Sequence, residues 1–262
     1  MNEPRCIPLE AIRDEPVGGK AEGLVRLIRY GFDVPEGFVI VAASEGRVPS
    51  DVDERYRSMG GGKVAVRSSA IGEDSDDASF AGQYETILDV EGTEALHAAI
   101  DECLKSVNNA RSAAYRDEKL GESDITMNIV VQRMVDARAA GVLFTANPIN
   151  ARRDQVVIDA IEGLGEALVS GQATPDHWVL RHDGTLLERE AQAEEPVLSD
   201  DEVQTLLDGA LRAASHYGEP LDMEWAIGAD GRLNWLQARP ITTLPADPNE
   251  LDTTPNPEDV YT

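Results

Sequence analysis

Two alternating segments near the C-terminus constrain the fold more than any other feature of the chain. Residues 221–227 and 232–239 alternate apolar and polar side chains, which predicts two β-strands. Asp230-Gly231 between them is a strong signal for a two-residue type I′ turn. Such a turn places Ala229 opposite Arg232 and fixes the register of the whole hairpin. The chain is therefore expected to contain an antiparallel sheet.

This register gathers polar groups on one face of the hairpin. Glu224 lies opposite Gln237, and Asp222 lies opposite Arg239. Opposed Cβ atoms are about 4.5–5.5 Å apart, so a carboxylate and an amide oxygen there can share one divalent cation, and Arg239 can clamp a phosphate. A solvent-facing edge hairpin with an ordinary ion pair fits the same pattern. The other face, expected to pack on the core, carries Met223, Trp225, Leu236 and Ala238.

The rest of the chain mixes expected strands and helices without strict alternation. Alternating or β-branched runs predict strands, and apolar residues at helical spacing predict helices. Strands are expected at residues 38–41, 64–66, 84–90, 129–131, 141–145, 156–158, 178–180 and 185–187, and helices at 24–28, 96–120 and 206–214. Residues 43–62 are polar and weakly patterned. This order predicts an α+β protein with two lobes.

Length and composition exclude several classes of protein. A chain of 262 residues with 42% hydrophobic content can bury a substantial core. It has no apolar run near the roughly 18–20 residues of a membrane span, and its N-terminus lacks the apolar region of a secretory signal. Cys6 and Cys103 are too few and too far apart for a zinc site or a disulfide framework. We expect a cytoplasmic protein.

The charge of the chain is strongly unbalanced. There are 49 acidic and 23 basic residues, so the formal net charge is −26. Such a field repels nucleic acid and anionic membranes, and we expect neither as a partner. An acidic surface kept for solubility explains the charge. Adaptation to a molar-salt cytoplasm explains it as well, because the screening length there falls to about 3 Å.

Three further segments suit the binding of an anion. Gly18-Gly19-Lys20 leads into an expected helix, whose start favours negative charge, although the spacing is not that of a Walker A loop. Arg67 stands at the end of an expected buried strand. Residues 78–83 form a small-residue loop that can close over phosphates as a lid. Taken singly, each segment fits an ordinary turn or loop equally well.

Together these segments resemble one family, the ATP-binding domain of pyruvate phosphate dikinase and phosphoenolpyruvate synthase, which rifamycin phosphotransferases share. The similar segments occur in family order over residues 17–243. They are residues 18–20, 34–40, 66–70, 77–83, 131–135, 141–145 with 147–148, 163–166 with 175–176, and 222–226 with 236–240. The chain departs from the family in a short segment between residues 41 and 63 and in a trimmed one between 175 and 198.

The resemblance implies an ATP-grasp fold, with the nucleotide between two lobes. The N-terminal lobe would cover residues 1–131, and residues 132–135 would be the hinge. The C-terminal lobe, with the metal-binding hairpin, would cover 136–243, followed by a Pro-rich acidic tail or linker over 244–262.

The resemblance also implies roles for individual residues, with ATP and Mg²⁺ as cofactors. The catalytic cations would be Lys20, Arg67 and Arg239, where Lys20 and Arg67 neutralise phosphates and Arg239 holds the terminal phosphate. The loop that covers the phosphates would be Phe80, Ala81, Gly82 and Gln83. The backbone contacts to adenine would come from Gln132, Arg133, Met134 and Val135. The Mg²⁺ ligands would be Glu224 and Gln237, in agreement with the hairpin register derived above.

The activity implied is that of an ATP-dependent, dikinase-type phosphotransferase component. It would pass phosphate to a histidine on a separate domain or protein, with a further pyruvate- or phosphoenolpyruvate-binding subunit as a second partner. The chain's own histidines lack the family's phosphohistidine context and are expected to be structural: His97, His177, His182 and His216. Two alternatives stay open at this point. One is the ATP half of a rifamycin-type phosphotransferase, and the other is a non-catalytic ATP sensor or truncated relic.

Overall fold

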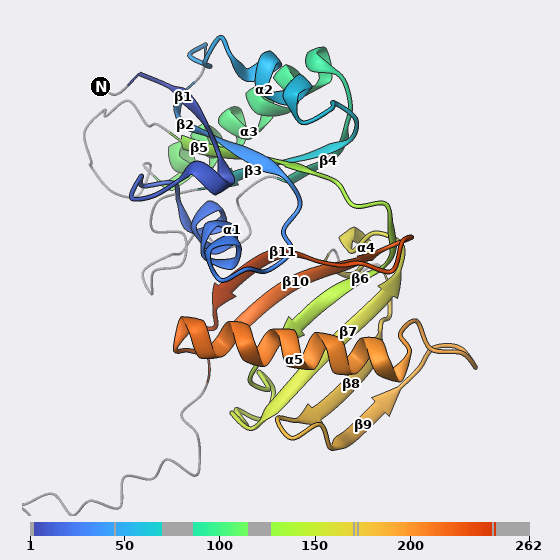
Figure 1. The fold of residues 1–262 in the computed structure, drawn as a ribbon. Coiled ribbons are helices and arrows are strands. Elements are labelled where there is room, and N and C mark those ends of the chain that lie inside the picture. The colour runs from blue at the N-terminus through green and yellow to red at the C-terminus, as the bar shows by residue number, and fades with distance from the viewer. Residues whose placement is uncertain are drawn as a thin grey trace, which may run out of the picture.

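The computed structural model describes residues 3–44, 46–69, 86–114, 127–169, 171, 173–242 and 244. Their strands form two separate antiparallel sheets (Figure 1). The two-lobed α+β architecture expected from the sequence is confirmed. No helix in this described part of the chain is long and apolar enough to cross a membrane.

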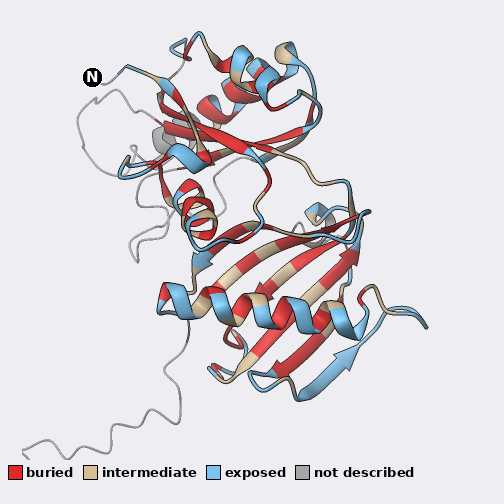
Figure 2. Cartoon of the chain, viewed as in Figure 1, coloured by how far each residue is buried: buried red, intermediate tan, exposed pale blue. Residues whose placement is uncertain are grey.

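The first sheet has the strand order β1-β2-β5-β3-β4. Its strands are β1 (Arg5–Pro8), β2 (Gly37–Ala43), β3 (Val64–Ser69), β4 (Thr86–Val90) and β5 (Met127–Arg133). One face packs on α3 (Thr93–Ala114) and α2 (Val52–Ser58) around a core that includes Phe38, Ile100 and Ile129. The other face packs on the 3-10 helix η1 (Leu9–Ala11) and on α1 (Gly19–Arg29). The strands β2 and β5 are therefore covered on both sides (Figure 2).

The second sheet has the strand order β11-β10-β6-β7-β8-β9. Its strands are β6 (Ala137–Phe144), β7 (Gln155–Glu162), β8 (Asp176–Arg181), β9 (Leu186–Glu190), β10 (Leu221–Gly228) and β11 (Leu233–Pro240). The helix α5 (Asp200–Tyr217) lies across one face (Figure 1). It buries an apolar stripe against Trp178, Trp225 and their neighbours. The short helix α4 (Glu166–Val169) follows β7.

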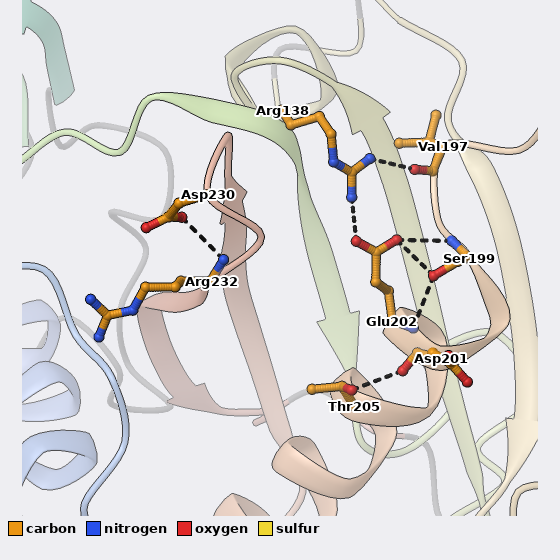
Figure 3. Close-up of polar contacts among 8 residues, drawn as sticks. All are labelled: Arg138, Val197, Ser199, Asp201, Glu202, Thr205, Asp230 and Arg232. Carbon is orange, nitrogen blue, oxygen red and sulfur yellow. Dashed lines mark hydrogen bonds and ion pairs between the residues drawn. The ribbon is translucent and has the colours of Figure 1, made fainter.

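A polar network fixes the start of α5 (Figure 3). The Ser199 hydroxyl accepts a hydrogen bond from the Glu202 backbone, and the Glu202 carboxylate accepts one from the Ser199 backbone, which is a capping box. Arg138 of β6 adds an ion pair to Glu202 and donates to the Val197 carbonyl at 3.0 Å. Gly218, in the left-handed conformation, ends the helix as expected.

Helix α1 joins the two sheets. Its Leu24 and Val25 pack with the first sheet, whereas Leu27 belongs to the core of the second. Gly23 lies against β11 so closely that a Cβ built there would be 2.1 Å from the Ala238 carbonyl oxygen. The Tyr217 hydroxyl donates to the Gly23 carbonyl at 2.9 Å and ties α1 to the end of α5. A division into lobes at residue 131 therefore leaves α1 in contact with both.

Several details of the expected elements are wrong. The polar segment 43–62 contains α2, and the N-terminal segment, where no strand was expected, contains β1, which pairs with β2 from Arg5 to Pro8. The expected helix over 96–120 is confirmed as far as Ala114, and residues 115–120 lie outside the described residues. The hairpin turn has three residues rather than two, because the Gly228 N–H donates to the Arg232 carbonyl at 3.0 Å and Gly231 takes the positive φ that such a loop requires.

Candidate functional site

A cavity of about 550 Å³ lies between the two sheets. Nine of the thirteen residues predicted to bind ATP or metal line it: Lys20, Arg67, Gln132, Arg133, Met134, Val135, Glu224, Gln237 and Arg239. The other four, Phe80, Ala81, Gly82 and Gln83, lie outside the described residues. The two sheets and α1 thus bring together every predicted site residue that the structure describes.

The hairpin presents its predicted polar face to this cavity. Glu224 pairs with Gln237 and Asp222 pairs with Arg239, as the sequence predicts. Beyond Glu224 a β-bulge shifts the register, so Trp225 pairs with Trp235. The three-residue loop and the bulge each displace the register by one residue in opposite senses. The prediction is therefore right at the site although its two-residue turn is wrong.

The bulge corrects one predicted position. Leu236 was expected on the core face, but it is the extra residue of the bulge and lines the cavity. Trp235 occupies the core in its place, with 3% of its surface exposed. The other residues expected on the core face, Met223, Trp225 and Ala238, are buried there. An extra residue on one strand therefore lets Leu236 and Gln237 both face the cavity.

Arg67 reaches across the cavity from the first sheet. Alternation along β3 turns Ala65 and Arg67 toward the cavity and Val64 and Val66 into the core. Nη2 of Arg67 is 3.2 Å from Oε2 of Glu224, and Nη1 donates to Oε1 of Gln237 at 3.4 Å. Nη1 also donates to the Leu236 carbonyl at 3.3 Å. One guanidinium therefore spans both predicted metal ligands.

Arg239 contacts the neighbouring carboxylate. Its Nε and Nη2 both donate to Oδ2 of Asp222, at 2.9 and 2.7 Å. The Arg239 side chain is 50% exposed, whereas Asp222 is 17% exposed. The pairing of Asp222 with Arg239 that the hairpin register predicts is thus formed, and its arginine lines the cavity.

The position of Lys20 depends on a buried serine. Lys20 is the second residue of α1 and lines the cavity. The Ser69 hydroxyl of β3 accepts from the Ala21 N–H at 3.2 Å and donates to the Val17 carbonyl at 2.9 Å. Gly18 between them has φ +82, and a Cβ there would be 2.5 Å from the Ser69 carbonyl oxygen. Only glycine fits this approach, which holds the helix start beside β3.

Residues 132–135 line the cavity where the chain passes from the first sheet to the second. Two of their N–H groups are already used: Arg133 donates to the Glu36 carbonyl at 2.8 Å, and Met134 donates to the Lys63 carbonyl at 3.0 Å. A backbone contact to a ligand here must therefore use other groups of this segment.

Buried donors that lack a partner point to the same region. Among the described residues, the buried side-chain atoms without a hydrogen-bond partner are Arg67 Nε, Gln132 Nε2 and Trp225 Nε1. All three side chains belong to residues that line the cavity. Unsatisfied buried donors are costly and are concentrated at functional sites. Their position supports a site for a ligand rich in acceptors.

Some lining residues were not predicted. Leu164, Gly165 and Glu166 enter from the loop and helix after β7, and Thr86 and Leu88 enter from β4. Residues 163–166 were recognised as a family-like segment, but no residue pattern near them indicated that the chain turns back there to line the cavity. The histidines lie elsewhere: His177 bonds Asp159 at 2.6 Å, His97 bonds Asp53 at 2.8 Å, and His216 stacks on Tyr30.

Comparison with known proteins gives consistent matches. Residues 45–192 and 181–259 match the family model described as pyruvate phosphate dikinase, AMP/ATP-binding domain. A probable phosphoenolpyruvate synthase of Methanothermobacter thermautotrophicus is 35% identical, over 87% of this chain and 44% of the relative. Rifampicin phosphotransferase from Streptomyces is 40% identical, over 69% of this chain and 23% of the relative.

Among solved structures, the ADP complex of N5-carboxyaminoimidazole ribonucleotide synthetase is 12% identical, with a TM-score of 0.44, over 86% of this chain and 45% of that one. The chain spans less than half the length of the curated relatives it matches.

Proposed function

Because the chain belongs to the pyruvate phosphate dikinase AMP/ATP-binding domain family, we propose that its inter-sheet cavity binds ATP with Mg²⁺ in the manner of an ATP-grasp enzyme. The chain would be the ATP-binding component of a dikinase-type phosphotransferase. One observation carries this proposal. A single cation, the Arg67 guanidinium, bridges Glu224 and Gln237 inside a cavity that Lys20 and Arg239 also line.

The charges of the cavity match the two ends of the nucleotide. Lys20, Arg67 and Arg239 would neutralise the phosphates, and the loop 80–83 would cover them. The apolar part of the lining, near Ala140 and Leu164, suits the adenine ring, with residues 132–135 beside it. Since the Arg133 and Met134 N–H groups are occupied, we expect adenine to be held through carbonyl groups and Val135.

The proposed metal ligands fit a divalent cation. Glu224 and Gln237 aim their oxygens at one positively charged group, and oxygen is the ligand that Mg²⁺ prefers. Among the described residues no cluster of three or more acidic, histidine or cysteine side chains could hold a metal. Phosphate oxygens and water would therefore complete the shell. Mg²⁺ bound there would neutralise charge on the phosphates.

The chain's own residues supply what phosphoryl transfer requires. The reaction depends mainly on positioning and on charge neutralisation, with little covalent work for the protein. Lys20, Arg67 and Arg239 would provide the neutralisation, and the two sheets would fix the geometry. We propose a histidine on a separate domain or protein as the acceptor, in a phosphoenolpyruvate synthase-like system with a pyruvate- or phosphoenolpyruvate-binding subunit.

Further parts of the proposal concern organisation and setting. Residues 132–135 would act as the hinge between lobes 1–131 and 136–243, with residues 244–262 as a linker toward the acceptor. We propose a cytoplasmic location for the protein, because ATP is available there to the site. A rifamycin-type acceptor is a second candidate, since the Streptomyces phosphotransferase is 40% identical over the matched region.

Calorimetric titration with ATP and Mg²⁺ tests the binding. We expect micromolar affinity for the unaltered chain and a loss of about 100-fold or more in Glu224→Ala, because one ligand to the cation disappears. Arg57→Ala, at an exposed i,i+4 pair on α2, is the matched control and should bind normally. Equal affinity in Glu224→Ala and the control would remove the assigned site.

Transfer from labelled ATP tests the activity. The chain is mixed with candidate phosphohistidine domains from a phosphoenolpyruvate synthase and from a rifamycin phosphotransferase, and label on each histidine is measured. Preferential labelling of the first supports the synthase-like system, and preferential labelling of the second supports the alternative. Tight ATP binding with no labelling of either would indicate a nucleotide sensor.

A further inference from the structure

The contacts of Arg67 are incompatible with two of the roles assigned around it. Its guanidinium occupies oxygens of Glu224 and Gln237 that a divalent cation would need. The same guanidinium is the group expected to meet the phosphates. Arg67 and a metal ion compete for the Glu224 oxygen that Arg67 now holds, since two positive charges at that distance repel each other. We therefore expect Arg67 to change partners when a nucleotide and a metal bind.

The exchange of partners affects both sides of the cleft, because the interacting side chains come from different sheets. Arg67 comes from β3 of the first sheet, and Glu224 and Gln237 come from β10 and β11 of the second. The Arg67 side chain is 11% exposed and that of Glu224 is 28% exposed. A partly buried carboxylate is stabilised by a counter-charge, and Arg67 provides one while the cleft is empty.

We propose that Arg67 is a latch that closes the metal site until a nucleotide arrives. Resting on the function proposed above, the inference is that the phosphate chain draws the guanidinium away from Glu224 and Gln237. Their oxygens then become available to the divalent cation. Metal binding would thus be conditional on nucleotide binding, and a free divalent cation would be excluded from the empty cleft.

The geometry also favours release of the latch. Nη1 shares its bonding between the Gln237 oxygen at 3.4 Å and the Leu236 carbonyl at 3.3 Å, which are long hydrogen bonds. Nε is buried and has no partner in the described part of the chain. A phosphate can accept two parallel hydrogen bonds from a guanidinium at shorter distances. The exchange therefore replaces long hydrogen bonds with shorter ones.

Binding of Mn²⁺ without nucleotide tests the latch. Free Mn²⁺ is measured by electron paramagnetic resonance at fixed ionic strength, for the unaltered chain and for Arg67→Gln. We expect Arg67→Gln to bind one Mn²⁺ at least about tenfold more tightly, within the range usual for coupled sites. The added affinity should vanish in the double variant with Glu224→Gln, which separates this site from the acidic surface.

A matched control removes the same charge without opening the latch. Lys20→Gln takes one positive charge from the same cavity and leaves the ion pair of Arg67 with Glu224 in place. It should strengthen Mn²⁺ binding only about two- to threefold by the general change in potential. Equal strengthening in Lys20→Gln and Arg67→Gln would overturn the latch, and so would no strengthening in a folded Arg67→Gln chain.

The two proposals fail in different ways. If the unaltered chain binds no ATP in the presence of Mg²⁺, the proposed function fails whatever the Mn²⁺ result. If it binds ATP, and Mn²⁺ binds the nucleotide-free chain as tightly as it binds Arg67→Gln, the latch alone fails. Circular dichroism melting of each variant confirms that the comparison is made between folded chains.

Discussion

At the scale of single residues, the cavity is organised by charged groups that hold one another in place. Arg239 is expected to meet a phosphate, and both of its bonded nitrogens contact one oxygen of Asp222. Asp222 thus helps to orient a side chain that is 50% exposed. The ion pair is worth little to stability but matters for the orientation of Arg239.

Asp222→Asn tests whether this ion pair orients Arg239 rather than stabilising the fold. The substitution should change the free energy of unfolding by less than about 1 kcal/mol, as for other exposed pairs. It should nevertheless lower ATP affinity by about three- to tenfold, because Arg239 loses its orientation. Denaturant unfolding and calorimetry measure the two quantities. A large loss of stability with normal ATP affinity would show that the pair is structural instead.

The sequence was informative at this scale where chemistry is local to a motif. The nine described site residues it predicts all line the cavity, because each stands in a short segment whose residue types suit phosphate, metal or adenine. Two features of the site could not be predicted from the sequence. The contribution of Leu164 to Glu166 depends on how the chain turns back after β7, and the partner of Arg67 depends on how the two sheets approach each other.

At the scale of elements, α1 is the piece that connects site and scaffold. It carries Lys20 at its start, and its Gly23 lies against β11, the strand that carries Gln237 and Arg239. A glycine inside a helix costs about 1 kcal/mol relative to alanine. Glycine is required at position 23 because the helix approaches the Ala238 carbonyl so closely that no side chain fits there.

Gly23→Ala should therefore destabilise the protein in spite of the better helix propensity. The new Cβ would sit 2.1 Å from a backbone oxygen, which has to move. We expect a net loss of about 1–3 kcal/mol from overpacking and weaker ATP binding, because β11 shifts between two site residues. Thermal melting and calorimetry check both. A gain of about 1 kcal/mol, the propensity effect alone, would contradict the packing argument.

The cap of α5 gives a prediction about pH. Burial acts to raise the pKa of the Glu202 carboxyl, but hydrogen bonds from Ser199 and the charge of Arg138 outweigh it, and the pKa lies below its usual 4.5. A lowered folded pKa means that the ionised cap stabilises the fold above about pH 4.5. This stabilisation is lost as the pH falls through the folded value.

The melting temperature of Glu202→Gln, compared with that of the unaltered chain between pH 7 and pH 3.5, measures this effect. The variant should melt lower at neutral pH, and the difference should shrink in acid. ATP affinity at neutral pH should not change, since α5 packs on the core face of the second sheet and none of its described residues lines the cavity. A difference that is constant over this range would show that the carboxylate charge is not what stabilises the cap.

The hairpin shows why element details are harder to predict than element identity. Glycine at position 231 satisfies a two-residue turn and a three-residue loop equally, since both need a positive φ there. The choice is made by the bulge at Leu236, which places Trp235 in the core. Helix α2 was missed for a related reason: its seven residues, Val52–Ser58, are mostly polar and bury only Val52 and Tyr56.

At the scale of the whole molecule, the net charge of −26 sets the conditions for stability. Like charges spread over the surface oppose the compact state, and salt screens them over about 30 Å at 0.01 M and about 3 Å at 1 M. Ion pairs such as Arg55 with Asp51 and Arg232 with Asp33 are exposed and contribute little, so their weakening by salt is the smaller effect.

The melting temperature should therefore rise from low salt to molar KCl. A titration with sucrose at matched osmolality is the control, because it stabilises by exclusion without screening charge. A rise in KCl that exceeds the rise in sucrose supports a salt-adapted surface. A melting temperature that stays flat or falls in KCl would leave solubility as the explanation of the charge.

The central claim is that the two sheets hold a nucleotide between them through the residues named above. A crystal structure of the chain with Mn²⁺ and a non-hydrolysable ATP analogue tests it most directly, by the anomalous signal of the metal. We predict a Mn²⁺ peak in direct coordination with Glu224 and Gln237, phosphates on Lys20, Arg67 and Arg239, and adenine beside residues 132–135. An analogue bound elsewhere, or a metal peak away from Glu224 and Gln237, would contradict the account.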